Sequence, residues 1–334
     1  MKQNLKKIFC ILLAVAMMAS FAACGEKEPA PQEEVAEAVP VNVMVLNGTT
    51  GFGMAGLIHN AAAGAAEQEY NISVETDASN ITAALISGSV DIAALPTNAA
   101  SVVYNKTEGA VQALALNTRG VLYLVSDGSV EIENFSSLQG QTVYVPAQNP
   151  SFIFEHLCKA NGLVVGEDVI IDKTYAQPAD LRTAVAAGEV SLAVLPEPMV
   201  TIASAENEAI KVAMDLTEQW DLVAPEGSLV QGCVVVRTQF AQEHPEQVAA
   251  FLKEYEASIA LCSEDAATAA AYIAEAEIFA NEKVAAAVMP RCNICFVTGE
   301  EMSTQLSTYL ELMAEVNPQS IGGAVPAEDF YYIP

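Results

Sequence analysis

Short apolar runs alternate with helix-like patterns along this chain, and one such unit occurs twice. Ile81 to Ala100 reads ITAALISGSVDIAALPTNAA, and Leu181 to Val200 reads LRTAVAAGEVSLAVLPEPMV. The copies lie 100 residues apart without a gap and share Ala84/Ala184, Gly88/Gly188, Val90/Val190, Ala93/Ala193, Leu95/Leu195 and Pro96/Pro196. Each copy predicts an apolar helix, a glycine, and a strand of about five residues that a proline ends.

The glycine and the apolar run of each copy predict specific local structures. Gly88 and Gly188 suit the left-handed residue that follows a helix, where a side chain would be strained. Val90 to Leu95 and Val190 to Leu195 are typical of strands buried on both faces of a parallel sheet. The residues after each proline are expected in a loop at the carboxyl end of the strand, where open α/β sheets bind ligands.

The repeat extends towards the N-terminus, which indicates two α/β lobes of like design. Val41 to His59 matches Gln141 to Lys159 at the same offset, so each half begins with a strand, a loop and a helix. A later strand at Gly232 to Arg237 is followed by helical patterns alone, and these must pack on a sheet already built. Lobe 1 is therefore predicted at 40–122 plus 231–334 and lobe 2 at 123–230, joined by two crossovers.

The first residues read as a targeting segment followed by a tether. Lys2, Lys6 and Lys7 precede an apolar stretch, and small residues lead to Cys24, as in a bacterial lipoprotein box. We therefore predict a signal peptide at 1–23 and lipidation of Cys24; an ordinary secretory signal is the alternative. Residues 24–39 hold Glu, Ala and Pro without an apolar period, which predicts a disordered acidic tether. The protein is expected outside the cytoplasm, anchored to the cell membrane by its lipid.

Charge and cysteine content exclude some partners. The chain has 42 acidic and 14 basic residues, a net charge of −28, so nucleic acid would repel it. Seven cysteines less Cys10 and Cys24 leave an odd number, which argues against a disulfide framework. Cys292 and Cys295 form a lone CxxC without two further zinc ligands at matching spacing, so no metal site is predicted. Whether these two cysteines form a disulfide stays open.

The segments around the repeat resemble type 2 solute-binding proteins of bacterial ABC importers. The sequences of these segments are similar to those of the group that binds nitrate, aliphatic sulfonates, taurine and thiamine pyrimidines. The resemblance covers nearly the whole mature chain and is carried by Asn47–Gly51, Leu95–Asn98, Lys159–Leu163, Leu195–Pro198 and Gln231–Val236. It implies two lobes, each a mixed, mostly parallel sheet with helices on both faces. It also implies a monomer without cofactor or catalysis that delivers a small organic solute to an ABC permease and its ATPase.

In that family the solute lies between the lobes, held by loops at strand ends and by helix starts. The resemblance places ten residues there: Thr49, Thr50, Gly51, Thr97, Asn98, Asn117 and Thr118 from lobe 1, and Asn149, Ser151 and Glu197 from lobe 2. Most are neutral hydrogen-bonding residues, which suits the acceptor-rich or anionic end of a small solute. Glu197 is the one acid, and a buried carboxylate needs a partner. We therefore expect an amine or N–H-rich group at the other end of the solute.

Structural roles compete with solute contact at several of these residues. Thr49 and Ser151 could cap their helices, Asn98 could form an Asx turn, and Glu197 could lie exposed at the rim. Two arginines, Arg119 and Arg182, are further candidates for an anionic solute, although Arg182 is more consistent with a solvated helix face. The single tryptophan, Trp220, is better explained by packing near the hinge than by stacking on a solute.

Three other functions remain as alternatives. Gly51-Phe-Gly53-Met-Ala-Gly56 matches the G-x-G-x-x-G of dinucleotide enzymes, but four residues separate its first glycine from the strand. An enzyme on the same fold, such as the pyrimidine-forming relative of the thiamine-precursor binders, would need a Cys-rich iron motif and a catalytic set that this chain lacks. A sensing module for a signalling partner would share all the sequence features of a transport component.

Overall fold

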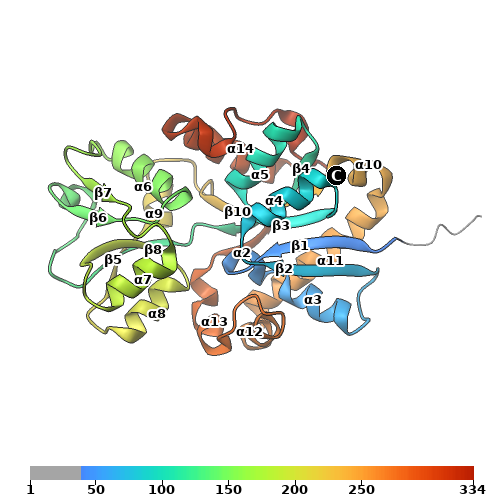
Figure 1. Ribbon diagram of the computed structural model, residues 1–334, viewed down its shortest axis with the longest axis horizontal. Coiled ribbons are helices and arrows are strands. Elements are labelled where there is room, and N and C mark those ends of the chain that lie inside the picture. The colour runs from blue at the N-terminus through green and yellow to red at the C-terminus, as the bar shows by residue number, and fades with distance from the viewer. Residues whose placement is uncertain (1–38) are drawn as a thin grey trace, which may run out of the picture. The chain divides into compact units, whose positions relative to one another are not determined.

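Two β-sheets organise the part of the chain that the computed structural model describes, residues 39–334 (Figure 1). The signal peptide, Cys24 and nearly all of the tether lie outside the described residues. The first sheet has the strand order β11-β4-β10-β3-β1-β2. Its strands are β1 (Val41–Leu46), β2 (Tyr70–Glu75), β3 (Ile92–Pro96), β4 (Val111–Arg119), β10 (Val230–Arg237) and β11 (Ile294–Val297). β1 pairs in parallel with β2 and β3, whereas β10 runs antiparallel to β3 and β4.

The second sheet is smaller and has the same mixed design, with the order β7-β6-β8-β5-β9. Its strands are β5 (Leu122–Ser126), β6 (Thr142–Tyr144), β7 (Ile170–Asp172), β8 (Leu192–Pro196) and β9 (Lys211–Asp215). β6 pairs in parallel with β7 and β8, and β5 runs antiparallel to β8 and β9. β4 leads into β5, and β10 returns the chain to the first sheet, so two crossovers join the sheets as predicted. The lobe boundaries drawn from the sequence stay a prediction.

Helices lie on both faces of the first sheet. Ala93 and Leu95 of β3 belong to an apolar cluster with α4, α5 and α14, whereas Ile92 and Ala94 belong to another with α10 and α11. β3 is therefore buried on both faces, as its continuous apolar run predicted. The helices are α2 (Thr49–Phe52), α3 (Ala55–Ala62), α4 (Ala78–Ser87), α5 (Thr97–Thr107), α6 (Asn149–Ala160), α7 (Pro178–Ala186), α8 (Met199–Glu206), α9 (Leu216–Asp221), α10 (Thr238–Glu243), α11 (Pro245–Glu264), α12 (Ala266–Glu275), α13 (Glu282–Val288) and α14 (Gly299–Val316), with 3-10 turns η1 (Phe135–Leu138), η2 (Met289–Arg291), η3 (Pro318–Ile321) and η4 (Glu328–Phe330).

The 100-residue repeat is visible in the elements, with one correction. Gly88 and Gly188 have φ values of 74° and 75°, so both are left-handed after a helix, as predicted. The loop expected after Pro96 is wrong, because α5 begins at Thr97 and Pro96 is its N-cap residue. The first N–H groups of a helix have no intrahelical acceptor, so a residue without an N–H loses nothing there. A strand can therefore pass directly into a helix at this proline.

The C-terminal part of the chain contains a strand that the sequence analysis missed. One of the helices expected after β10 is α11, which packs Phe251 and Tyr255 in one cluster with Val43 and Val45 of β1, so it lies on the first sheet as predicted. The expectation of helices alone after β10 is wrong, because Ile294–Val297 forms β11 against β4 at the edge of the first sheet. Four residues are too few to show a period of two, so the pattern could not separate this strand from its surroundings.

The glycine motif at residues 51–56 serves helix packing. A Cβ atom added to Gly53 would lie 2.6 Å from Ile259 Cγ1, and one added to Gly56 would lie 2.8 Å from Ser258 Oγ. Both neighbours belong to α11, so these glycines let the α2–α3 segment approach that helix closely. Ser258 Oγ accepts a hydrogen bond from Leu57 N (3.0 Å) and donates one to the Gly53 carbonyl (2.6 Å), which satisfies buried backbone groups at the α2–α3 break. The resemblance to a dinucleotide fingerprint therefore has a packing explanation.

Nowhere in residues 39–334 does a helix have the length and apolarity needed to cross a membrane.

We predict that Gly53→Ala destabilises the protein by about 1–3 kcal/mol, because the added methyl overpacks the contact with α11. Urea unfolding measures the loss. Ile259→Ala removes the clashing Cγ1 atom, so the Gly53→Ala/Ile259→Ala double variant should lose less stability than the sum of the two single variants. Strictly additive losses would contradict this packing explanation.

Candidate functional site

The predicted site residues lie at or after the carboxyl ends of strands in both sheets, and they form three groups. The first group surrounds Asn117 near the end of β4. Its Nδ2 donates to the Thr50 carbonyl at 3.1 Å and to the Tyr255 hydroxyl at 3.0 Å, and its Oδ1 accepts from Thr118 Oγ1 at 3.1 Å. Asn117 and Thr118 are about 1% exposed. Asn117 therefore fixes the first turn of α2 relative to α11, and Tyr255 is a member that the sequence analysis missed.

Close backbone approach holds this first group in place. A Cβ on Gly232 of β10 would lie 2.4 Å from Asn117 Oδ1, and a Cβ on Gly51 would lie 2.5 Å from the Leu46 carbonyl. Gly51 thus has a packing role at the end of β1. The N-cap of α2 is Gly48, at φ 80°, so Thr49 is the first helical residue and is not the cap.

The second group links the first turns of α5 and α6 through a tyrosine of α14. Tyr309 donates its hydroxyl proton to Asn149 Oδ1 at 2.6 Å, and Thr97 lies near that hydroxyl. Burial raises the pKa of Tyr309, so the hydroxyl keeps its proton. Thr97 also donates to the Val230 carbonyl at 2.8 Å. Thr97 follows a strand of the first sheet and Asn149 a strand of the second, so Tyr309 joins predicted residues from both sheets.

Two further predicted residues accompany the second group. Ser151 donates to the Gln148 carbonyl at 2.9 Å within the first turn of α6; the N-cap position belongs to Gln148. Asn98 lies in the first turn of α5, and its buried Oδ1 has no hydrogen-bond partner within residues 39–334. A buried acceptor without a partner costs free energy, so Asn98 is available for a partner that the folded chain does not supply.

The third group centres on Glu197, which follows β8 and is joined to Pro198 by a cis peptide bond. Its side chain is completely buried, and Oε1 forms an ion pair with Arg291 Nη2. The backbone N–H and the hydroxyl of Thr201 donate to its carboxylate at 3.2 Å and 3.1 Å. Arg291 belongs to η2, which leads into β11 of the first sheet. Its guanidinium carbon Cζ lies 5.8 Å from the ring centroid of Tyr123 in β5.

Arg291 changes the electrostatic argument for this site. Burial raises the pKa of Glu197, and the Arg291 charge together with the Thr201 hydrogen bonds opposes that rise. Glu197 therefore has its partner within the chain, and a solute need not supply one. The alternative of an exposed rim position is also wrong, since the carboxylate is buried. The chain has 42 acidic and only 14 basic residues, so a buried acid such as Glu197 has few possible partners within the chain, and arginines are among them.

The remaining candidates have structural explanations. Arg182 forms an ion pair with Glu206 at 2.7 Å between α7 and α8, and Arg119 lies 3.9 Å from Glu301. Trp220 is fully buried and packs against His156 and Tyr309, with ring centroids 4.8 Å and 5.9 Å away. These contacts agree with a packing role for the tryptophan.

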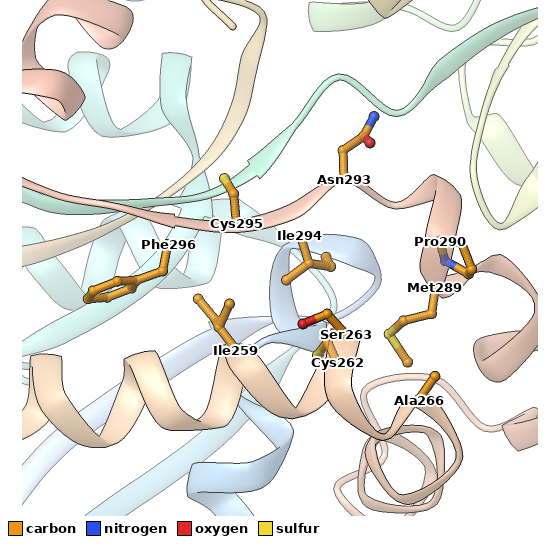
Figure 2. A pocket seen from close by; sticks show the side chains of 10 residues that line it. All are labelled: Ile259, Cys262, Ser263, Ala266, Met289, Pro290, Asn293, Ile294, Cys295 and Phe296. Carbon is orange, nitrogen blue, oxygen red and sulfur yellow. The ribbon is translucent and has the colours of Figure 1, made fainter.

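A cavity of about 470 Å³ lies between α11, α12 and the η2–β11 segment, and its lining includes no residue of the three groups. Figure 2 shows Ile259 of α11 and Ile294 of β11 pointing towards each other across it. Its lining also includes Cys262 and Cys295, and burial raises the pKa of both thiols to about 11. The five cysteines of the described chain are free thiols, so Cys292 and Cys295 form no disulfide here. Across residues 39–334 no group of three or more His, Cys, Asp or Glu side chains is arranged to hold a metal ion.

Comparisons with known proteins agree with this architecture. The family profile described as NMT1/THI5 like matches residues 66–269, more than half of the chain. An ABC transporter protein from Parabacteroides distasonis has 22% identity and a TM-score of 0.73, over 88% of this chain and 98% of its own. The periplasmic aliphatic sulphonate binding protein SsuA from Escherichia coli has 14% identity and a TM-score of 0.70, over 88% and 92%. The periplasmic nitrate-binding protein NrtA from Synechocystis has 13% identity and a TM-score of 0.53, over 74% and 69%.

At these identities the solved structures show the fold alone, and the predicted two-lobed periplasmic-binding-protein fold is confirmed. A comparison with curated protein sequences gives no match.

We predict that Tyr309→Phe lowers the free energy of unfolding by about 0.5–1.5 kcal/mol, because one buried hydrogen bond to Asn149 is lost. The same substitution in an Asn149→Ala background should cost clearly less, since the acceptor is already gone. Urea unfolding of the wild type, the two single variants and the double variant gives the coupling free energy between Tyr309 and Asn149. Equal losses in both backgrounds would show that this hydrogen bond does not join the two sheets.

Proposed function

Because the chain belongs to the NMT1/THI5-like family, we propose that it is the extracytoplasmic solute-binding component of an ABC import system. It captures a small organic solute between its two lobes and delivers it to a permease and its ATPase. The similar structures are named as binding proteins for aliphatic sulphonates and nitrate, which supports binding without chemical conversion here too. The lobes of this proposal are 40–122 with 231–334, and 123–230.

One observation carries the proposal. Thr97, after a strand of the first sheet, and Asn149, after a strand of the second, are both neighbours of the Tyr309 hydroxyl. Residues chosen from the ends of strands in two different sheets therefore lie next to the same side chain. A solute bound at this junction would contact both sheets, and the helix starts there favour an acceptor-rich or anionic group.

The charge of the site narrows the solute class. Glu197 and Arg291 neutralise each other, and the other proposed contacts are uncharged: Thr49, Thr50, Gly51, Thr97, Asn98, Asn117, Thr118, Asn149 and Ser151. The site therefore selects mainly by hydrogen bonding, and the solute needs no cationic end. Small oxyanions and amino-sulfonates both meet this condition.

Asn98 provides the most specific test of the site. Native mass spectrometry of the freshly purified protein should show a retained small molecule, and calorimetry with nitrate, taurine and MOPS should give saturable binding for at least one. MOPS is included because an alkanesulfonate-binding SsuA from Xanthomonas axonopodis was solved with it. Asn98→Ala should weaken that binding about tenfold through the loss of one hydrogen bond of about 1.4 kcal/mol. Its unfolding midpoint should not fall, because the removed acceptor has no partner in the folded chain.

Asn134→Ala is the matched control. Asn134 caps η1 by accepting a hydrogen bond from Ser136 N at 2.9 Å, so this variant should lose stability and keep its affinity. If Asn98→Ala behaves like the control, the solute does not contact Asn98. If no retained molecule and no binding are found, the proposed function itself fails.

The membrane attachment in this proposal depends on Cys24. Cys24→Ser should release the exported protein from the membrane fraction into the soluble fraction, because the lipid supplies the apolar anchor. Immunoblots of fractionated cells measure this. A variant that is exported and stays as membrane-bound as the wild type would rule out the lipid anchor while leaving solute binding untouched.

A further inference from the structure

The η2–β11 segment connects the two sheets at a point outside the two crossovers. Its residue Arg291 is paired with Glu197 and donates to the hydroxyl of Thr201, both next to the second sheet. The hydroxyl of Tyr123 in β5 donates to the Arg291 carbonyl at 3.1 Å. Side chain and backbone of one residue thus contact three residues around the second sheet.

The same segment is fixed to the crossover. Asn293 donates its Nδ2 to the Gly120 carbonyl at 2.5 Å, and its own carbonyl accepts from Arg119 N at 3.0 Å. β11 then begins at Ile294 and pairs with β4. Arg291 therefore has a short, rigid connection to the first sheet, so any rotation of one sheet away from the other about Gly120 must separate Arg291 from Glu197.

The energetics of the pair are asymmetric. The Glu197 side chain is 0% exposed, whereas that of Arg291 is 42% exposed. The guanidinium is already partly in water and loses little when the pair separates, whereas the carboxylate loses the counter-charge that offsets its burial. The ion pair therefore stabilises the protein fully only when the two sheets have the mutual orientation seen here.

We infer that Arg291 is a positioning residue that acts through Glu197 to hold the two sheets in the solute-binding orientation. The inference rests on the proposed function, because this orientation matters only if a solute is captured between the lobes. Arg291 also keeps the carboxylate neutralised, so the site presents no net charge at the end of β8.

Trp220 supplies a readout that needs no solute. It is the single tryptophan of the chain, is fully buried, and packs between His156 of α6 and Tyr309 of α14. α14 follows β11 of the first sheet, whereas α6 follows β6 of the second. Rotation of the sheets away from each other should expose this indole, shift its emission to longer wavelength and increase its quenching by acrylamide.

The experiment compares Arg291→Gln, Glu197→Gln, the double variant and Arg291→Lys in the full chain without added solute. Arg291→Gln and the double variant should both show red-shifted, more strongly quenched Trp220, and Arg291→Lys should return the signal towards the wild type because it keeps the charge. In urea, Arg291→Gln should have the lowest midpoint. The double variant should be more stable than Arg291→Gln, since it leaves no unpaired buried carboxylate.

The double variant keeps the inference falsifiable if Arg291→Gln fails to fold. It should be stable and yet show the exposed Trp220, a combination that a purely structural ion pair would not produce. Arg182→Gln is the matched control, because it breaks the Arg182–Glu206 pair between α7 and α8 and should leave Trp220 unchanged.

Wild-type Trp220 emission and quenching in the double variant would overturn the inference. So would an Arg291→Gln variant that is no less stable than the double variant. Neither result depends on solute, so failure of the inference is distinct from failure of the proposed function, which the binding measurements with nitrate, taurine and MOPS decide.

Discussion

The backbone of Gly120 and Val121 is the point on which the site depends. The Gly120 carbonyl accepts from Asn293 of the C-terminal segment, Val121 N donates to Gln231 of the second crossover, and the Val121 carbonyl accepts from Glu197 N. Gly120 has no room for a side chain, because a Cβ there would lie 2.2 Å from Thr217 Oγ1. Three parts of the chain therefore meet on two peptide groups, and their relative positions follow from that contact.

This constraint explains how the neutral side chains of the proposed site are held in fixed positions. Asn117 lies three residues before Gly120 and is held against Thr50 and Tyr255, so the crossover also fixes the start of α2. Glu197 is fixed from the other side by its backbone bond to Val121. Because buried hydrogen bonds position these side chains, the proposed solute would meet preformed partners and would not have to order them.

Much of the fold could be predicted from the sequence because the signals were local. The paired Gly88 and Gly188 required a left-handed backbone, and apolar runs of about five residues required strands buried on both faces. β11 gave no such signal, because four residues between a 3-10 turn and a helix show no period. The loop expected after Pro96 failed for a different reason: a proline that ends a strand can also begin a helix.

Only part of the proposed site could be predicted, because several of its residues have partners that lie far away in the sequence. The expected residues follow strand ends, which the repeat located, whereas their partners Tyr255, Arg291 and Tyr309 lie on α11, η2 and α14. No local pattern distinguishes a tyrosine that faces the core from one that orders a site, since both occupy apolar helix positions. Charge balance was the one available signal for Arg291. In a strongly acidic chain, a buried carboxylate must either draw on one of the few arginines or accept a proton, and this chain uses the arginine to connect its two sheets.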